Sequence, residues 1–160
     1  MSKKFHHAFK FEYNGVVPAL ITPVGINIAE ITRQDKKSQF TQVNALWDTG
    51  ATHSVITPRL AKHLGLIPID KTTVTGVNSK EEVNVYLVDL LLPNNLCFPN
   101  VKITESDFVG ADILIGMNII QNGDFAIANA KGKTRFSFCI PPHDNPICLY
   151  EKSIKVNKRK

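Results

Sequence analysis

The residues best suited to chemistry in this chain form a short turn, Asp48-Thr49-Gly50-Ala51, which directly follows an apolar stretch ending at Trp47. Two carboxylates that lie roughly 3 Å apart share one proton, so one can act as a base while the other acts as an acid. Such a pair can activate water for attack on an amide carbonyl and protonate the departing amine. The sequence contains no second Asp-Thr-Gly or Asp-Ser-Gly. A complete pair would therefore need a second copy of the chain.

The composition of this turn suits a carboxylate that water and substrate must reach. A tight turn projects the Asp48 side chain, and the small Gly50 lets backbone and water come close. The Thr49 hydroxyl could form a hydrogen bond to the turn of a partner. An Asp-Thr-Gly turn also occurs where the carboxylate bonds only to nearby backbone, so the surrounding sequence has to decide. Further along, the chain contains the run Asp112-Ile113-Leu114-Ile115-Gly116-Met117-Asn118.

At this pair of motifs the sequence resembles the retropepsins, the aspartic proteases of retroviruses and LTR retrotransposons and their bacterial relatives. In that family an Asp-Thr/Ser-Gly-Ala turn follows an apolar strand. A second aliphatic run, followed by Gly, a variable residue and Asn or Asp, packs beneath it. The resemblance covers about residues 40–140 and is closest to bacterial or mobile-element members. It implies an all-β fold, a closed acid-protease barrel with one lobe per chain and a short helix, assembled as a homodimer.

The resemblance also implies roles for individual residues of the turn. Asp48 matches the catalytic aspartate, and Thr49 matches the threonine that bonds across the dimer. Gly50 and Ala51 correspond to backbone that lines the substrate cleft. Thr52 stands where many retroviral enzymes have an aspartate that binds substrate backbone, so this position is expected to contact the peptide.

Two further segments take their roles from the same resemblance. Gly76-Val77-Asn78 corresponds to the flap, a hairpin that closes over the bound peptide, although this segment has fewer glycines than retroviral flaps. Ile115 and Gly116 are expected to support the active-site turn from below, and Asn118 is expected to open the short helix. The resemblance implies no metal and no organic cofactor.

Other residue types with catalytic or metal-binding potential form no convincing pattern. His53 and Ser54 are neighbours in sequence, and neighbours rarely form a nucleophile and base pair. The five histidines, His6, His7, His53, His63 and His143, lack the spacing of metal ligands.

The cysteines point to a reducing compartment. Cys97, Cys139 and Cys148 are an odd number without metal-type spacing, which favours a cytoplasmic protein. Cys97 and Cys139 lie in strand-like segments and are expected to be small apolar core residues.

Charge is concentrated at the two ends of the chain. Of the net charge of +5, residues 1–10 and residues 141–160 each contribute +3, which leaves −1 for the residues between. Basic ends on a near-neutral body are typical of solvated tails, so nucleic-acid binding is not expected. No apolar run approaches the ~18 residues that span a membrane. We therefore expect a basic tail at 1–8, a protease domain at 9–140 and a basic, weakly ordered tail at 141–160.

The elements that must position the turn are mostly short strands. Alternation predicts a strand over 9–13, and Asn14-Gly15 predicts a hairpin to the strand that follows. A strand over 40–47 is expected to lead into the Asp48 turn, and 111–116 is expected to be a buried strand that ends at a glycine. The best helix covers 58–66, where Thr57 can act as N-cap, Pro58 suits the first position and Gly65 ends the helix.

The sequence therefore favours an aspartic endopeptidase whose two Asp48 carboxylates come from two subunits of a homodimer. A non-catalytic retropepsin fold, serving in dimerisation or peptide binding, stays open as the alternative. A nucleic-acid accessory protein with basic tails is a third hypothesis, and it predicts salt-dependent binding.

Overall fold

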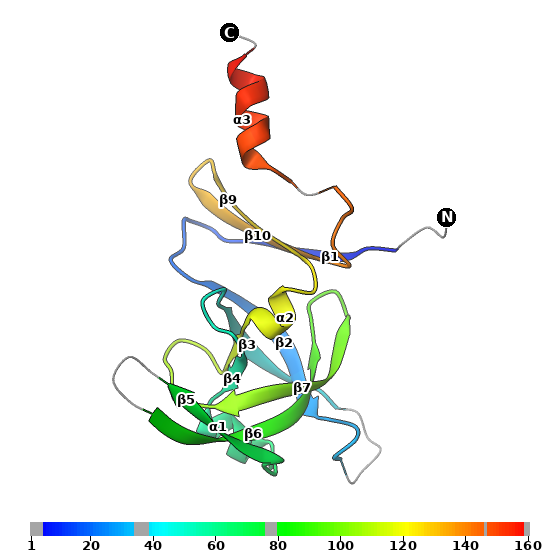
Figure 1. Ribbon diagram of the computed structural model, residues 1–160, viewed down its shortest axis with the longest axis vertical. Coiled ribbons are helices and arrows are strands. Elements are labelled where there is room, and N and C mark those ends of the chain that lie inside the picture. Colours follow the sequence, from blue (N-terminus) through cyan, green and yellow to red (C-terminus); the bar gives the residue numbers. More distant parts are fainter. Residues whose placement is uncertain (1–4, 34–38, 76–79, 146, 159–160) are drawn as a thin grey trace.

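A computed structural model describes residues 5–33, 39–75, 80–145 and 147–158 of the chain (Figure 1). Within these residues the chain forms ten strands and three short helices. The strands are β1 His7–Glu12, β2 Leu20–Ile28, β3 Thr41–Trp47, β4 Ser54–Ile56, β5 Asp70–Thr75, β6 Lys80–Leu91, β7 Cys97–Glu105, β8 Ile113–Ile115, β9 Asp124–Ala130 and β10 Lys133–Ile140. The helices are α1 Pro58–His63, α2 Met117–Ile120 and α3 Leu149–Asn157. The predicted all-β class is confirmed.

Most strands belong to one sheet that closes on itself. Its strand order is β2-β3-β8-β4-β7-β6-β5, and β2 also pairs with β6. The second pairing joins six of the strands into a closed barrel, with β5 continuing beyond β6 as a hairpin. Pro23 lies in the part of β2 that pairs only with β3, since the pairing with β6 begins at Gly25. Its missing N–H therefore costs the barrel no ladder bond.

The barrel interior is filled by aliphatic side chains that alternate along the strands. Ile26, Ile56, Ile103, Ile113 and Ile115 are completely buried. Each such side chain contributes roughly 1.5–3 kcal/mol by leaving water. In the short strands β4 and β8 the first and third residues are buried, so both strands are fixed by the core on one face.

A second sheet, with strand order β1-β10-β9, lies against one end of the barrel (Figure 1). Its inner face packs on the indole of Trp47, the last residue of β3, with ring centroids 5.0–6.2 Å away. The rings in this cluster are those of Phe9, Phe125, Phe136 and Phe138. The indole N–H donates to Thr22 Oγ1 at 2.9 Å inside the core, which satisfies its one polar atom. Trp47 therefore connects the two sheets directly beside Asp48.

Helix α1 begins where its sequence predicts, but it ends at His63 and not at Leu66. The Thr57 hydroxyl accepts from the Leu60 N–H at 3.4 Å, Pro58 opens the helix, and Leu60 and Ala61 face the core. Gly65 follows with a φ of +66°, a conformation that glycine adopts without strain. A helix this short depends on the barrel for its stability.

Two predictions about strand pairing and the core are wrong. Asn14-Gly15 does not turn β1 back onto β2, because β1 pairs with β10. Phe9 and Phe11 of β1 pack against the core, and Gly15 O accepts from the Thr134 N–H, so the segment continues along β10 instead. Cys97 is exposed rather than a core residue, whereas Cys139 is buried as predicted.

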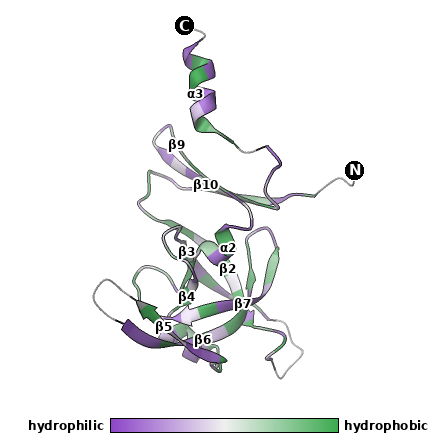
Figure 2. Ribbon diagram, viewed as in Figure 1, coloured by the Kyte–Doolittle hydropathy of each residue, from purple (hydrophilic) through white to green (hydrophobic). Residues whose placement is uncertain are grey.

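Residues 149–157, within the expected C-terminal tail, form helix α3. None of its residues is buried, and the helix projects away from both sheets in Figure 1. Figure 2 shows apolar and polar stretches along it, and Leu149, Tyr150 and Val156 are exposed. The domain limits at residues 9 and 140 stay a prediction. In the described part of the chain, no helix has the length and apolar character needed to cross a membrane.

Candidate active site

Asp48 is placed by the pairing of two parallel strands. β3 and β8 run side by side, with Trp47 opposite Ile115, and the backbone N–H of Asp48 donates to Ile115 O at 3.0 Å. Ile115 is completely buried. The ladder between β3 and β8 thus extends to the first residue of the turn, so the core strand fixes where the Asp48 backbone leaves the barrel.

Within the turn, the carboxylate is held by local backbone. Asp48 Oδ1 accepts from the Gly50 N–H at 2.8 Å, and the Ala51 N–H lies 3.4 Å from Asp48 O. The Asp48 side chain is half-buried, while Thr49 and Gly50 are exposed. A Cβ at Gly50 would lie 3.2 Å from Asp48 Oδ1, so glycine keeps this approach open. The turn presents one carboxylate at the surface in a fixed orientation.

Gly116 allows the chain after β8 to pass directly against the turn. A Cβ at this position would lie 2.6 Å from His53 O and 2.8 Å from Ala51 O, so no side chain fits. The next two N–H groups, of Met117 and Asn118, donate to Ala51 O at 2.8 Å and to Thr52 O at 3.1 Å. Helix α2 begins here and is linked to the turn by backbone hydrogen bonds alone.

A buried serine completes this support. The Ser54 hydroxyl donates to Asn118 Oδ1 at 2.8 Å and accepts from the Gly116 N–H at 3.1 Å. The Ser54 N–H also donates to Asn118 Oδ1, at 3.0 Å. The sequence predicted that Asn118 opens helix α2, but Asn118 is the second residue of this helix. Gly116 is the N-cap and Met117 begins the helix. The Asn118 side chain instead turns back toward β4.

The sequence of this region matches a known family. The sequence model described as aspartyl protease matches residues 35–119, which is more than half of the chain. The chain belongs to the aspartyl protease family. The matched segment contains the Asp48 turn and the run from Ile113 to Asn118 that supports it.

One solved structure, with a TM-score above 0.5, places the fold within this family more narrowly. A retropepsin-like aspartic protease from Rickettsia conorii is 14% identical in sequence and superposes with a TM-score of 0.53, covering 88% of this chain and 98% of that one. The EIAV protease, solved with the inhibitor HBY-793, is 24% identical with a TM-score of 0.49, and the match covers 68% of this chain and 90% of that one. No curated protein gives a significant match to the sequence. The fold is that of the retropepsin-like aspartic proteases.

For this aspartyl protease family member, the residues predicted from the sequence divide into two groups. Asp48, Ile115, Gly116 and Asn118 lie together, joined by the contacts above, with Thr49 to Thr52 in the same turn. Gly76, Val77 and Asn78, the predicted flap, lie outside the described residues. The strands that flank this segment, β5 and β6, pair antiparallel up to Thr75 opposite Lys80.

The role of Ser54 was missed by the sequence analysis, which considered its hydroxyl only as a nucleophile beside His53. The hydroxyl is committed to Gly116 and Asn118, while His53 is exposed. The only sequence signal for this role is a small polar residue in an otherwise apolar strand.

Two other polar groups stabilise the frame around the site. Asp112 accepts from the Asn44 N–H at 3.0 Å and from Arg59 at 2.9 Å, which joins β3, β8 and α1. The Tyr86 hydroxyl donates to Glu105 at 2.5 Å between β6 and β7. Burial, together with this hydrogen bond, raises the pKa of Tyr86 to about 12.

Proposed function

We propose that the protein is an aspartic endopeptidase in which two copies of the chain each contribute one Asp48 carboxylate. The observation that carries the proposal is the Asp48 turn itself. One carboxylate, oriented by the Gly50 N–H, stands at the surface above a backbone support built from Ile115 and Gly116. In a two-fold symmetric dimer the same surface of each copy meets its equivalent, so two such turns come together on the axis.

The chemistry of such a pair needs no cofactor. One carboxylate is ionised and removes a proton from a water molecule, whose oxygen attacks the carbonyl carbon of the peptide bond. The protonated carboxylate of the other subunit donates toward the carbonyl oxygen. When the C–N bond breaks, the carboxyl that took the water proton gives it to the amide nitrogen, and the other carboxylate takes a proton back from a hydroxyl of the tetrahedral intermediate. The pair therefore begins the next cycle with one proton.

Two features of the surface support an assembly of two copies. Thr49 is exposed beside Asp48, where its hydroxyl can bond to the partner turn. The last five residues of β9, at one edge of the second sheet, are also exposed, and Asp124 is the one charged residue in this strand. An unpaired strand edge with little charge is suited to pairing with another chain.

The substrate would bind in extended form across the turn. The carbonyl oxygens of Ala51 and Thr52 already accept from α2, and the Ala51 N–H donates to Asp48 O, so these two residues would contact the peptide mainly through their side chains. Thr52 is exposed and supplies a hydroxyl. The hairpin of β5 and β6 would carry Gly76, Val77 and Asn78 over the peptide as the flap. Extended peptides bind in this way through strand-like backbone contacts.

The compartment proposed is the cytoplasm. Cys97, Cys139 and Cys148 are all free thiols, as expected where disulfides do not form.

The test is cleavage of a diverse peptide library from about pH 4 to about pH 7, where a shared-proton pair works best. The parent chain is compared with Asp48→Asn and with Asp107→Asn, a matched change at an exposed aspartate outside the turn. We expect cuts by the parent and by Asp107→Asn, none by Asp48→Asn, and specific activity that falls on dilution as the dimer dissociates. Equal cleavage by Asp48→Asn would refute the catalytic assignment. Silence from all three chains would favour the non-catalytic peptide-binding alternative.

A further inference from the structure

The register of the second sheet brings His6, Cys139 and Asp124 together at one of its ends. β1 pairs with β10 so that Ala8 lies opposite Cys139, and β10 pairs with β9 so that Cys139 lies opposite Asp124. Side chains alternate along a strand, so residues two apart share a face. His6, two residues before Ala8, therefore falls on the same face as Cys139 and Asp124.

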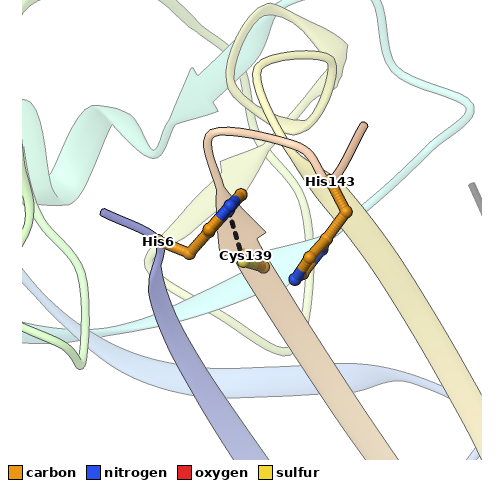
Figure 3. Close-up of side chains that lie close together, drawn as sticks. All are labelled: His6, Cys139 and His143. Atoms are coloured by element: carbon orange, nitrogen blue, oxygen red, sulfur yellow. Dashed lines mark hydrogen bonds between the residues drawn. The ribbon is translucent and has the colours of Figure 1, made fainter. Parts of the chain in front are cut away.

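The fourth residue, His143, reaches this face from the segment after β10. Its N–H and its Nδ1 both contact Asp124 Oδ2, at 2.9 and 2.6 Å. The imidazoles of His6 and His143 are stacked, with ring centroids 4.5 Å apart and an angle of 5° between their planes. Cys139 Sγ lies 3.9 Å from His6 Nδ1. In Figure 3 the two rings flank Cys139, and candidate ligand atoms of all three residues lie within 4.8 Å of one another.

The hydrogen bonds around the two rings use Nδ1 of His6 and of His143, which leaves Nε2 of each ring available to bind a metal ion. A backbone carbonyl only accepts, so the contact of 2.9 Å between His6 Nδ1 and Pro141 O places a hydrogen on Nδ1 and leaves Nε2 as the nitrogen that faces a metal ion. The Asp124 carboxylate likewise selects the His143 tautomer with hydrogen on Nδ1. A carboxylate behind an imidazole is the usual way in which proteins orient a metal-binding histidine.

We propose that His6, Cys139 and His143 bind a zinc ion, with Asp124 as the positioning residue for His143 and an external ligand in the fourth position. Two neutral imidazoles and a thiolate are a ligand set that Zn²⁺ accepts in tetrahedral geometry. The thiolate and the Asp124 carboxylate together balance the two positive charges. Tetrahedral ligands at zinc lie roughly 3.3–3.6 Å apart. The side chains therefore close by about 1 Å, and the stacked rings tilt apart.

The zinc ion would connect the segment before β1, the end of β10 and the segment that follows β10. His6 precedes β1, Cys139 is near the end of β10, and His143 begins the path toward α3. The site lies in the second sheet, whereas Asp48 follows a strand of the barrel. Zinc binding at this site therefore does not depend on the proposed protease activity.

The test uses the full chain without an added histidine tag, freed of metal by chelation, and titrated with Zn²⁺ and with Co²⁺. We expect one ion per chain and, with Co²⁺, a thiolate-to-metal charge-transfer band with strong visible bands of four-coordinate cobalt. Zinc at a hundredfold excess over its Kd should raise Tm by roughly 5–10 °C. His6→Ala, His143→Ala and Cys139→Ser should lose saturable binding, and Asp124→Asn should bind roughly 10–100-fold more weakly.

Controls separate this site from other sources of binding. His7→Ala, beside His6, and His63→Ala, on α1, change exposed histidines outside the cluster and should bind zinc as the parent does. Asp48→Asn should also bind normally, which separates this site from the catalytic assignment. Thermal melts without metal check that each variant is folded. Absence of one-to-one binding by the parent, or binding that survives both Cys139→Ser and His143→Ala, would overturn the proposal.

Discussion

The barrel and the three-stranded sheet are stabilised in different ways. In the barrel six strands close into a ring, and side chains such as those of Ile26, Ile103 and Ile113 are completely buried. In the β1-β10-β9 sheet two edges stay unpaired, and most of β9 is exposed. A closed ring satisfies its own backbone, whereas an open sheet needs another surface to cover it. The closed barrel can therefore hold the Asp48 turn in one position, whereas the open sheet is suited to assembly and to a metal cross-link.

The largest expected effect comes from breaking the joint between the two regions. Trp47→Ala removes the ring against which Phe136 and Phe138 pack and leaves a cavity, so unfolding free energy should fall by roughly 3–5 kcal/mol. Denaturant unfolding measures the loss, and Trp47→Phe should recover part of it. A loss below about 1 kcal/mol would mean that the sheet does not depend on this contact.

The next largest effect is expected at Gly116, where the chain after β8 passes close to the Asp48 turn. Gly116→Ala places a methyl group 2.6 Å from His53 O and must displace the turn or α2, at a cost of roughly 1–3 kcal/mol or more. Cleavage activity should fall with it, since the displaced backbone supports Asp48. Gly15→Ala is the matched control, because a Cβ there meets nothing within 4 Å. Equal Tm values for the two variants would contradict this role of Gly116.

The pH dependence of stability should also differ between the two regions. The folded-state pKa of Tyr86, about 12, exceeds the ordinary value of 10.0, so its stabilising effect is complete below pH 10 and is lost between pH 10 and 12. Tyr86→Phe should remove this part of the alkaline loss of Tm. A parent and variant with parallel profiles above pH 10 would contradict the prediction.

On the open sheet the corresponding pair is Glu12 and Arg135, whose side chains are both exposed. The hydrogen bond and the charge of Arg135 lower the pKa of Glu12 below 4.5, so this pair stabilises above pH 4.5 and its effect is lost as the pH falls. Solvent screens exposed pairs. Glu12→Gln should therefore change the acid side of the profile less than Tyr86→Phe changes the alkaline side.

The smallest effect is expected at the C-terminal end. Removing residues 148–160 deletes α3, none of whose residues is buried, and leaves His143 in place. The Tm of the chain should change by less than about 2 °C, and zinc binding should persist. A large fall in Tm would show that α3 has a partner in solution. Sedimentation of the parent and of the shortened chain would then show whether that partner is a second copy of the chain.

Much of the candidate site was predictable because it is built locally. The Asp48 turn and the run from Ile113 to Gly116 can be recognised from their residue types. The glycine at position 116 has a clear structural explanation, since only a residue without a Cβ fits against the turn. Ser54 was not predictable in its actual role, because its hydroxyl is matched by Gly116 and Asn118, far along the chain. The flap residues, Gly76 to Asn78, lie outside the described part of the chain and stay a prediction.

The metal cluster shows the limit of spacing rules. His143 follows Cys139 by one short segment, but His6 lies at the other end of the chain, and the histidines alone show no pattern. Only the pairing of β1 with β10 makes His6 a neighbour of Cys139. The same pairing made the hairpin predicted at Asn14-Gly15 wrong.

The sequence by itself determined the local features of this protein: the all-β class, the turn that carries Asp48, and helix α1 with Thr57 and Gly65 at its ends. These features depend on backbone preferences and on alternation within a few residues. The tertiary structure decided which strands pair, that Ser54 supports the site, and that His6, Cys139 and His143 meet. Strand pairing is a long-range choice, because every strand offers the same backbone groups and the shared core selects the partner.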